Sequence, residues 1–307
     1  MNGKLLLLIL LVGALLTGTF ALVATADDEP GAQSSRADSP TGRFPASASN
    51  GSPTLWAVGD GADGSENSRR LARTIADAEP GLFAYLGDVY QEGRAFEFVN
   101  NYETVYGPLN PITLPTPGNH DWPLHDEGYD PYWANVIGGE PPHHYATSLA
   151  GWRILSLNSE DSLEPGSPQL RWLSRQVVRG GSCRIAFWHR PRYSAGSHGD
   201  QPDVEPLWRL LEGRAALVLN GHDHNSQELQ PQGGTVELIA GGGGHGLYPL
   251  DPSYPRLAWS NQTDDVAVRI RLSRRQARYD FVSTTGAVLR SGSVDCKPGR
   301  GRGRPPA

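Results

Sequence analysis

Residue types that commonly bind metal ions follow short apolar runs at five separate places in the 307-residue chain. They are Asp60 in VGD, Asp88 in LGD, Asn119, His120 and Asp121 in GNHD, His189 in FWH, and His222 and His224 in GHDH. Imidazole nitrogens, carboxylates and amide oxygens suit transition metals such as Zn, Fe and Mn. The set exceeds the four ligands of one tetrahedral zinc ion. The pattern therefore predicts two metal ions that share a bridging carboxylate.

Each motif also has an ordinary structural interpretation when it is taken alone. A Gly-Asp pair after a strand is typical of a turn in which the Asp caps the next helix. Asn119 could be a left-handed turn residue, and His189, which precedes Arg190-Pro191, could be a loop histidine. These interpretations do not explain why five separate strand ends carry metal-binding residue types. Their joint placement favours the metal site.

The segments around these motifs alternate between strand and helix patterns. Strand-like runs end at the motifs, over residues 54–60, 82–88, 112–121, 183–189 and 215–222. A hairpin is predicted on either side of Gly151, and further strands over 235–244, 265–273, 276–284 and 287–296. This order predicts a layered α/β domain with a mixed sheet, in which the C-terminal strands complete that sheet or a second one. Ligands of open α/β sheets bind at the carboxyl ends of the strands, where the motifs lie.

Helical periodicity predicts four helices between the strands, over residues 67–81, 94–107, 167–180 and 203–213. In the first, Leu71, Ile75 and Ala78 form the apolar face; in the second, Phe96, Val99 and Tyr106 do so. The third helix begins with Ser167 as its cap and Pro168 in its first turn, and the fourth ends at Gly213.

The two ends of the chain differ in composition from this central domain. One Lys, an apolar run over 5–23 and Ala24-Thr25-Ala26 are arranged as in a secretory signal peptide of residues 1–26. The same run is long enough to span a bilayer uncleaved, so a cleaved signal and a membrane anchor both remain open. Residues 27–52 are predicted to form a disordered linker, 53–296 the domain, and 297–307 a disordered basic tail.

Cysteine content and net charge limit the classes of function. Cys183 and Cys296 are the only cysteines, and in an exported chain such a pair predicts a disulfide that ties the last strand to the core. A thiolate ligand or nucleophile is the alternative, although neither belongs to a CxxC motif. A net charge of −6 provides no basic field for nucleic acid, so no nucleic-acid partner is expected. A serine hydrolase would need a G-x-S-x-G motif, which the sequence lacks.

In chain order, the motifs VGD, LGDVY, GNHD, WHRPRYSAGSHG and NGHDH resemble the calcineurin-like metallophosphoesterase superfamily. The resemblance is strongest to the purple acid phosphatase branch and its bacterial relatives. It implies a four-layer α/β/β/α sandwich of two mixed β-sheets flanked by helices. It also implies hydrolysis of a small-molecule phosphate ester, chiefly a phosphomonoester, by attack of a metal-bound hydroxide. A phosphodiesterase of the same superfamily and a non-enzymatic metal-binding exported domain are the alternatives.

The resemblance also implies a role for each site residue. One ion, divalent or trivalent Fe, Zn or Mn, would bind Asp60, Asp88, His224 and, as in the purple branch, a tyrosine. The second ion would bind the bridging Asp88 together with Asn119, His189 and His222. His120 would contact the substrate and assist the leaving group, Asp121 would orient His120, and His198 would contact the phosphate or support the ligands.

Tyr90 departs from the pattern of the purple branch. It follows Asp88 by two residues, whereas the branch places its tyrosine three residues after the bridging Asp. We therefore expect Tyr90 to leave the strand end in a different direction, and its role as a ligand stays open. Ala62 stands where other branches carry a histidine, so the first metal site depends on Tyr90 for its completeness.

Overall fold

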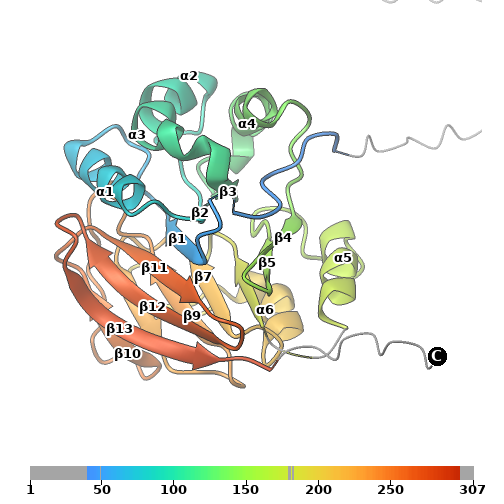
Figure 1. Ribbon diagram of the computed structural model, residues 1–307, viewed down its shortest axis with the longest axis vertical. Helices are drawn as coiled ribbons and strands as arrows, with labels where there is room; N and C mark the ends of the chain where they lie inside the picture. The colour runs from blue at the N-terminus through green and yellow to red at the C-terminus, as the bar shows by residue number, and fades with distance from the viewer. Residues whose placement is uncertain (1–39, 49, 179–180, 182, 298–307) are drawn as a thin grey trace, which may run out of the picture. The chain divides into compact units, whose positions relative to one another are not determined.

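A computed structural model of the chain describes residues 40–48, 50–178, 181 and 183–297 (Figure 1). The predicted signal segment, residues 27–39 of the predicted linker and residues 298–307 of the predicted tail lie outside the described residues. In the described part of the chain, no helix is both long enough and apolar enough to cross a membrane.

Two mixed β-sheets form the centre of the domain, as the resemblance implied. The six-stranded sheet contains, in spatial order, β13 (Val288–Asp295), β12 (Gln276–Ser283), β11 (Val266–Leu272), β1 (Thr54–Val58), β2 (Leu82–Tyr85) and β3 (Thr113–Pro115). The seven-stranded sheet contains β10 (Leu257–Asn261), β8 (Ser226–Leu229), β9 (Val236–Ala240), β7 (Leu217–Asn220), β6 (Arg184–Phe187), β5 (Trp152–Ser156) and β4 (Tyr145–Leu149). The C-terminal strands complete the first sheet; β8 and β10 were not predicted from the sequence.

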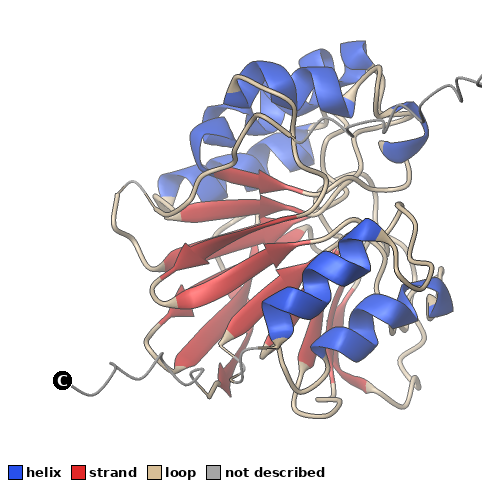
Figure 2. Ribbon diagram, turned by 90° about the vertical axis from the view of Figure 1, so that its right-hand side faces the viewer, coloured by secondary structure: helices blue, strands red, loops and turns tan. Residues whose placement is uncertain are grey.

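Helices cover the outer faces of the two sheets, with the strands between them (Figure 2). The first group contains α1 (Glu66–Asp77), α2 (Ala95–Glu97), η1 (Phe98–Glu103), α3 (Thr104–Tyr106), η2 (Gly107–Ile112), η3 (Trp122–Leu124) and α4 (Tyr129–Ile137). The second group contains α5 (Pro168–Val177), η4 (Pro202–Val204) and α6 (Glu205–Leu211).

Alternating side chains of the central strands explain this layering. Successive residues of a strand point to opposite faces of its sheet. In β6, Ile185 and Phe187 belong to the core between the sheets, whereas Ala186 belongs to the core beneath α5 and α6. In β7, Leu217 likewise faces the first core and Val218 the second. Apolar residues on both faces bury the sheet on both sides, and the predicted four-layer α/β/β/α fold is confirmed.

The second predicted helix buries a different face from the one expected. Phe96 and Val99 are 59% and 58% exposed, whereas Phe98 and Tyr102 are buried. The cause is a π-helical segment, η1, in which the backbone hydrogen bonds span five residues rather than four. This change of period rotates the buried face away from the one that α-helical spacing predicts.

The compact unit begins at Pro40, so the ordered domain extends into the predicted linker. Phe44 is buried against Trp133 and Tyr145. The Pro45 carbonyl accepts a hydrogen bond of 2.8 Å from the Thr147 hydroxyl of β4. The buried Phe44 ring and this hydrogen bond together hold a segment whose composition alone is typical of disorder.

The parallel strands of both sheets carry the chemical motifs at their carboxyl ends. In the first sheet, β1, β2 and β3 run parallel; in the second, β5, β6, β7 and β9 do. Asp60, Asp88 and Asn119 follow strands of the first sheet, and His189 and His222 follow strands of the second. The two sheets therefore deliver polar groups from both sides of the core.

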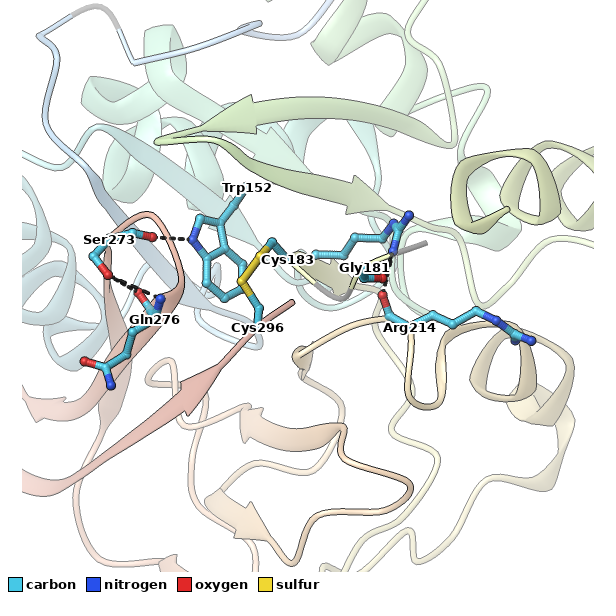
Figure 3. Close-up of a disulfide and its surroundings, with 8 residues drawn as sticks. Trp152, Gly181, Cys183, Arg214, Ser273, Gln276 and Cys296 are labelled. Atoms are coloured by element: carbon cyan, nitrogen blue, oxygen red, sulfur yellow. Dashed lines mark hydrogen bonds between the residues drawn. A yellow bond between two sulfur atoms is a disulfide. The ribbon is translucent and has the colours of Figure 1, made fainter. Parts of the chain in front are cut away.

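A disulfide joins the two sheets at the opposite end of these strands (Figure 3). Cys183 directly precedes β6, Cys296 directly follows β13, and their Cα atoms are 4.8 Å apart. The indole nitrogen of Trp152 donates a hydrogen bond of 2.7 Å to the Ser273 carbonyl beside it. The predicted connection between the last strand and the core is confirmed.

We expect removal of this disulfide to lower the free energy of unfolding by roughly 2 to 5 kcal/mol, because it closes a long loop between residues 113 positions apart. Chemical denaturation of wild type and Cys296→Ser, with and without reductant, measures the effect. The double variant Cys183→Ser/Cys296→Ser should have the same free energy of unfolding as the single variant, with or without reductant. Equal stability of wild type in both conditions would contradict the prediction.

Candidate metal centre

The backbone takes an uncommon conformation at three of the residues predicted to bind metal. Asp60, Asp88 and His222 have φ angles of 60°, 68° and 70°, in the left-handed region that side chains other than glycine seldom adopt. Such conformations cost energy and concentrate at functional sites, where neighbouring contacts enforce them. Each of the three lies shortly after a strand, and their polar atoms meet where strands of the two sheets end.

The first cluster of ligand atoms surrounds the hydroxyl of Tyr90. This oxygen lies 3.0 Å from Asp60 Oδ1, 2.9 Å from His224 Nε2 and 3.3 Å from Asp88 Oδ2. His224 Nε2 is 3.5 Å from Asp60 Oδ1. Despite its altered spacing, Tyr90 thus points into the group of residues with which the resemblance associates it.

The position of Tyr90 follows from contacts that sequence spacing does not reveal. Its N–H donates a hydrogen bond of 3.0 Å to the Ala62 carbonyl, and its carbonyl accepts one of 2.6 Å from Asn101. The Tyr85 hydroxyl also holds the Asp88 carbonyl, at 2.5 Å. These bonds redirect the loop after β2 and return the phenol to the end of β1.

The second cluster of ligand atoms surrounds Nε2 of His189. This nitrogen lies 3.3 Å from Asp88 Oδ2, 3.1 Å from Asn119 Oδ1 and 3.2 Å from His222 Nδ1. Asp88 Oδ2 therefore belongs to both clusters. Asp60, Asp88 and His189 also form a buried set whose ligand atoms all lie within 4.8 Å of one another.

These separations fit ligands that surround metal ions. Atoms about 2.0 to 2.2 Å from one cation lie roughly 2.9 to 3.6 Å from each other, which is the range found in both clusters. The His189 Nδ1 donates to the Leu86 carbonyl at 2.8 Å, and the His224 Nδ1 donates to the Gly246 carbonyl at 3.1 Å. Each bond places the proton on the outer nitrogen and leaves Nε2 free for a cation. The residues present therefore fit two metal ions.

The electrostatics of the centre also favour cations. Burial raises the pKa of Asp60 well above its usual value, and burial likewise raises that of Tyr90. Burial also acts to raise the pKa of Asp88, but the adjacent His189 outweighs it and lowers that pKa. Burial lowers the pKa of His222 to about 2 and that of His224 to about 4, so both imidazoles are neutral at pH 7. Without metal, protonated His189 is therefore the one cationic side chain among these ligands, beside two buried carboxylates.

Gly118 allows the loop that carries Asn119 to approach Asp88 closely. A Cβ atom at residue 118 would collide with the Asp88 carboxylate. The N–H of His120 donates to Asp88 Oδ1 at 3.0 Å, which leaves Oδ2 for the two clusters. Glycine is thus required here by the space around the shared carboxylate.

The Asp121 carboxylate, predicted to orient His120, bonds backbone groups rather than the His120 ring. It accepts hydrogen bonds of 2.8 Å each from the backbone N–H groups of Asp88, Val89 and Gly118. The His120 Nδ1 instead donates to the Gln91 carbonyl, and its Nε2 lies 3.9 Å from Asp88 Oδ2. Asp121 therefore fixes the two loops that carry the shared carboxylate and Asn119.

His198 lies over the second cluster, as a supporting group would. Its ring stacks on that of His222 with centroids 4.1 Å apart. Its Nδ1 and its backbone N–H both lie 3.0 Å from Oδ1 of the buried Asp223. Asp223, which had no predicted role, thus anchors the 194–198 loop to the GHDH motif.

Two further rings cover the first cluster, and neither was assigned from the sequence. His245 stacks on Tyr90 with centroids 3.6 Å apart, and Tyr248 stacks on His224 at 3.9 Å. The Asp63 carboxylate holds His245 Nδ1 at 3.1 Å. The four consecutive glycines before His245 were the sequence feature that could have indicated this position, since a glycine-rich loop lets the backbone approach a bound ligand closely.

A cavity of about 300 Å³ adjoins the centre on the side of His120. Its lining combines polar and apolar side chains, namely Gln91, Glu92, Arg94, Asn119, His120, Pro123 and Leu124. Asn119 thus lies between the cavity and the second cluster, and His120 lies between the cavity and the shared Asp88 carboxylate. The cavity offers a compact space for a group attached to a ligand of the centre.

Comparison with known proteins adds sequence relatives. Residues 53–226, more than half of the chain, match the model of the calcineurin-like phosphoesterase family. Purple acid phosphatase 7 of Arabidopsis thaliana is 31% identical over 176 residues, which cover 55% of this chain and 45% of that protein. The chain therefore spans about half the length of this curated relative.

Solved structures share the fold at low sequence identity. A purple acid phosphatase from yellow lupin (Lupinus luteus) superimposes with a TM-score of 0.64 at 15% identity, over 79% of this chain and 53% of the lupin chain. GAP50, the anchor in the inner membrane complex of Plasmodium, superimposes with a TM-score of 0.66 at 15% identity, over 80% of this chain and 90% of that chain.

We expect Asp121→Ala to lower the free energy of unfolding by about 3 kcal/mol or more, because three buried backbone donors lose their acceptor. Chemical denaturation measures this change. His120→Ala is the matched control, since the His120 ring is partly exposed, and we expect a change of no more than about 1 kcal/mol. Equal destabilisation by the two substitutions would contradict the role assigned to Asp121.

Metal binding should release protons at neutral pH. Burial acts to lower the pKa of His189, but Asp88 outweighs it and raises that pKa to about 10, so the metal-free residue is charged at pH 7. A metal ion binds only the neutral imidazole, so its binding displaces at least one proton per chain. The affinity should therefore rise with pH between about 6 and 8.

Titration calorimetry of metal-free protein with Mn²⁺, in buffers of different ionisation enthalpy, counts these protons. His189→Ala should release fewer protons than wild type. The expectation fails if wild type shows the same affinity at both pH values and no proton release.

Proposed function

Because the chain belongs to the calcineurin-like phosphoesterase family, a family of metal-dependent phosphoester hydrolases, we propose that it hydrolyses small phosphate esters at a dinuclear metal centre. The observation that carries this proposal is the sharing of Asp88 Oδ2 by two clusters of ligand atoms. One carboxylate oxygen that belongs to both clusters can bridge two adjacent cations and offset part of their mutual repulsion.

The proposal assigns a ligand set to each of two ions, which we take to be Fe, Zn or Mn in divalent or trivalent form. One set is Asp60, Asp88, Tyr90 and His224; the other is Asp88, Asn119, His189 and His222. When bound, the two ions supply Lewis acidity, which lowers the pKa of water and neutralises charge that develops on phosphate oxygens. The chain's part is to hold these ligands rigidly, with His222 and His224 already neutral and His189 giving up a proton when metal binds.

His120 is the proposed general acid of the reaction. Its Nδ1 is held by the Gln91 carbonyl, which leaves Nε2 directed toward the centre. In the imidazolium form, which carries a proton on both ring nitrogens, Nε2 can give its proton to the departing alcohol oxygen and leave a neutral ring. We assign Asp121 the positioning of the Asp88 and Asn119 loops, and His198 the support of His222 at the edge of the substrate site.

Phosphomonoesters are the proposed substrates, with the alcohol part in the cavity beside His120. Its volume of about 300 Å³ suits one compact group, and its Pro123 and Leu124 suit a partly apolar one. The name of the Arabidopsis relative, an acid phosphatase, supports the same preference. A phosphodiesterase is the alternative, since it would use the same centre and differ only in accommodating a second ester group.

We also propose that the protein is exported. The disulfide between Cys183 and Cys296 supports this, because such bonds persist in oxidising compartments. The signal-like segment of residues 1–26 gives the same indication from the sequence. Membrane attachment would then depend on whether that segment is retained.

A substrate panel with metal controls tests the proposed function. Purified protein should hydrolyse monoesters faster than diesters, lose activity with a chelator, and regain it with Zn²⁺, Mn²⁺ or iron. Asp88→Ala should lose bound metal and at least about 1000-fold in kcat/KM. Full turnover in that variant, or activity that ignores the chelator, would refute the dinuclear mechanism.

Tyr90→Phe tests the proposed tyrosine ligand. Its removal should weaken binding of one ion by about 10- to 100-fold and abolish the visible tyrosinate absorption of iron-loaded protein. Tyr248→Phe is the matched control, because Tyr248 stacks on His224 while its hydroxyl makes no hydrogen bond to the centre. An unchanged spectrum in Tyr90→Phe would exclude Tyr90 as a ligand.

The leaving group reveals the role of His120. For an alkyl phosphate, whose alcohol is a poor leaving group, His120→Ala should lower kcat by about 100-fold or more. For an aryl phosphate with an acidic phenol, the loss should be much smaller, because that leaving group needs no proton. An equal loss for both esters would indicate a binding role instead.

A further inference from the structure

A second group of ligand atoms lies outside the proposed metal centre, on three separate segments. His125 follows η3, Asp130 lies in the first turn of α4, and His143 precedes β4. His125 Nδ1 and His143 Nε2 lie 2.7 Å from opposite oxygens of the Asp130 carboxylate. The three ligand atoms all lie within 4.8 Å of one another.

We propose that His125, Asp130 and His143 bind a third, structural cation of the Zn²⁺ class. Two imidazole nitrogens and one carboxylate oxygen are donors that Zn²⁺ and neighbouring divalent metals take, and water completes their coordination. This site shares no residue with the dinuclear centre, so the inference does not depend on the proposed function.

The surroundings of this site favour entry of a cation. The side chains of His125, Asp130 and His143 are 32%, 24% and 28% exposed, so an ion can reach them from solvent. An adjoining cavity of about 270 Å³ is lined by Asp126, Asp130, Pro131, Ala134, Glu140 and Pro141. Three carboxylates and no basic side chain line it, which concentrates positive ions at the site.

Contacts around the two histidines hold their rings in place. The indole of Trp122 stacks on His125 with centroids 4.1 Å apart and meets the His143 ring edge-on at 5.0 Å. The Asp130 N–H donates to the His125 carbonyl at 2.7 Å. The ligands are therefore brought together before an ion binds, which reduces the entropy that binding costs.

Binding needs a change of tautomer at each ring and a small outward shift of the imidazoles, because the two 2.7 Å separations from Asp130 are shorter than the roughly 2.9 to 3.6 Å expected between ligands of one cation. In the ion-free state, each imidazole donates a proton to Asp130 from the nitrogen that faces it. The outer nitrogens, His125 Nε2 and His143 Nδ1, make no hydrogen bond to a described residue and can carry the proton instead. The inner lone pairs then face the cation, with no net loss of a proton.

An ion here would brace one wall of the cavity beside His120. Pro123 and Leu124 line that cavity and lie directly before His125 in the chain. A cation would connect this segment to α4 and to the residues before β4. Its effect would therefore be structural, on the substrate cavity rather than on the reacting atoms.

Metal content separates this proposal from a simple hydrogen-bonded clamp. Full-length protein equilibrated with Zn²⁺ and freed of excess should lose one ion per chain in His143→Ala relative to wild type. His144→Ala is the matched control, because the neighbouring His144 contacts Trp172 rather than the cluster, and it should keep the wild-type content. His125→Gln, a milder change, should lose the same ion even if His143→Ala folds poorly.

A second comparison keeps the result independent of the dinuclear centre. The Asp88→Ala variant should still bind one Zn²⁺ ion, at the His125–Asp130–His143 cluster. Adding His143→Ala to that variant should weaken the binding of this ion at least 100-fold. The proposal is overturned if adding His125→Gln leaves the amount of bound Zn²⁺ unchanged both in the wild-type protein and in the Asp88→Ala variant. A hydrogen-bonded cluster that holds no ion predicts that outcome, even where the substitution lowers the thermal stability.

Discussion

The buried carboxylate of Asp88 is the constraint on which the rest of the site depends. Among the described residues, neither Asp88 nor Asp60 has an ion pair with Lys or Arg, and both side chains are fully buried. Buried carboxylates that lack compensation destabilise a fold by several kcal/mol. Without metal, the chain reduces this cost by holding His189 protonated and by raising the pKa of Asp60. Two cations would offset it more completely, so the site is built to bind positive charge.

The fold meets this constraint by using both sheets as rigid supports. Parallel strands of each sheet end at the same region, where the polar atoms of the left-handed residues Asp60, Asp88 and His222 meet. Backbone carbonyls then fix the outer nitrogens of His189 and His224. These hydrogen bonds help to offset the energetic cost of the left-handed backbone conformations. They also restrict the movement of the ligand side chains.

The segment from Asn119 to His125 connects the proposed centre with the second cluster. It begins with a candidate ligand of the dinuclear centre, continues through the cavity wall, and ends at a residue of the His125–Asp130–His143 cluster. Its anchor at the first end is Asp121, which bonds three backbone N–H groups. The cavity wall is therefore held at both ends, which explains how a short irregular segment can present a defined surface to a substrate.

Residue type and periodicity alone were enough to predict the candidate ligands, most of the secondary structure and the disulfide. Polar residues at strand ends identified the candidate ligands, alternation and helical spacing identified most elements, and the isolated cysteines identified the disulfide, because each is a local pattern. Tertiary contacts decided the rest. The direction of Tyr90 depends on Ala62 and Asn101, and the bonding of Asp121 depends on the loop after β2. The buried face of 94–107 depends on a π-helical turn, and the ordered structure of residues 40–48 depends on the burial of Phe44. Such contacts join residues far apart in the chain, so local sequence does not encode them.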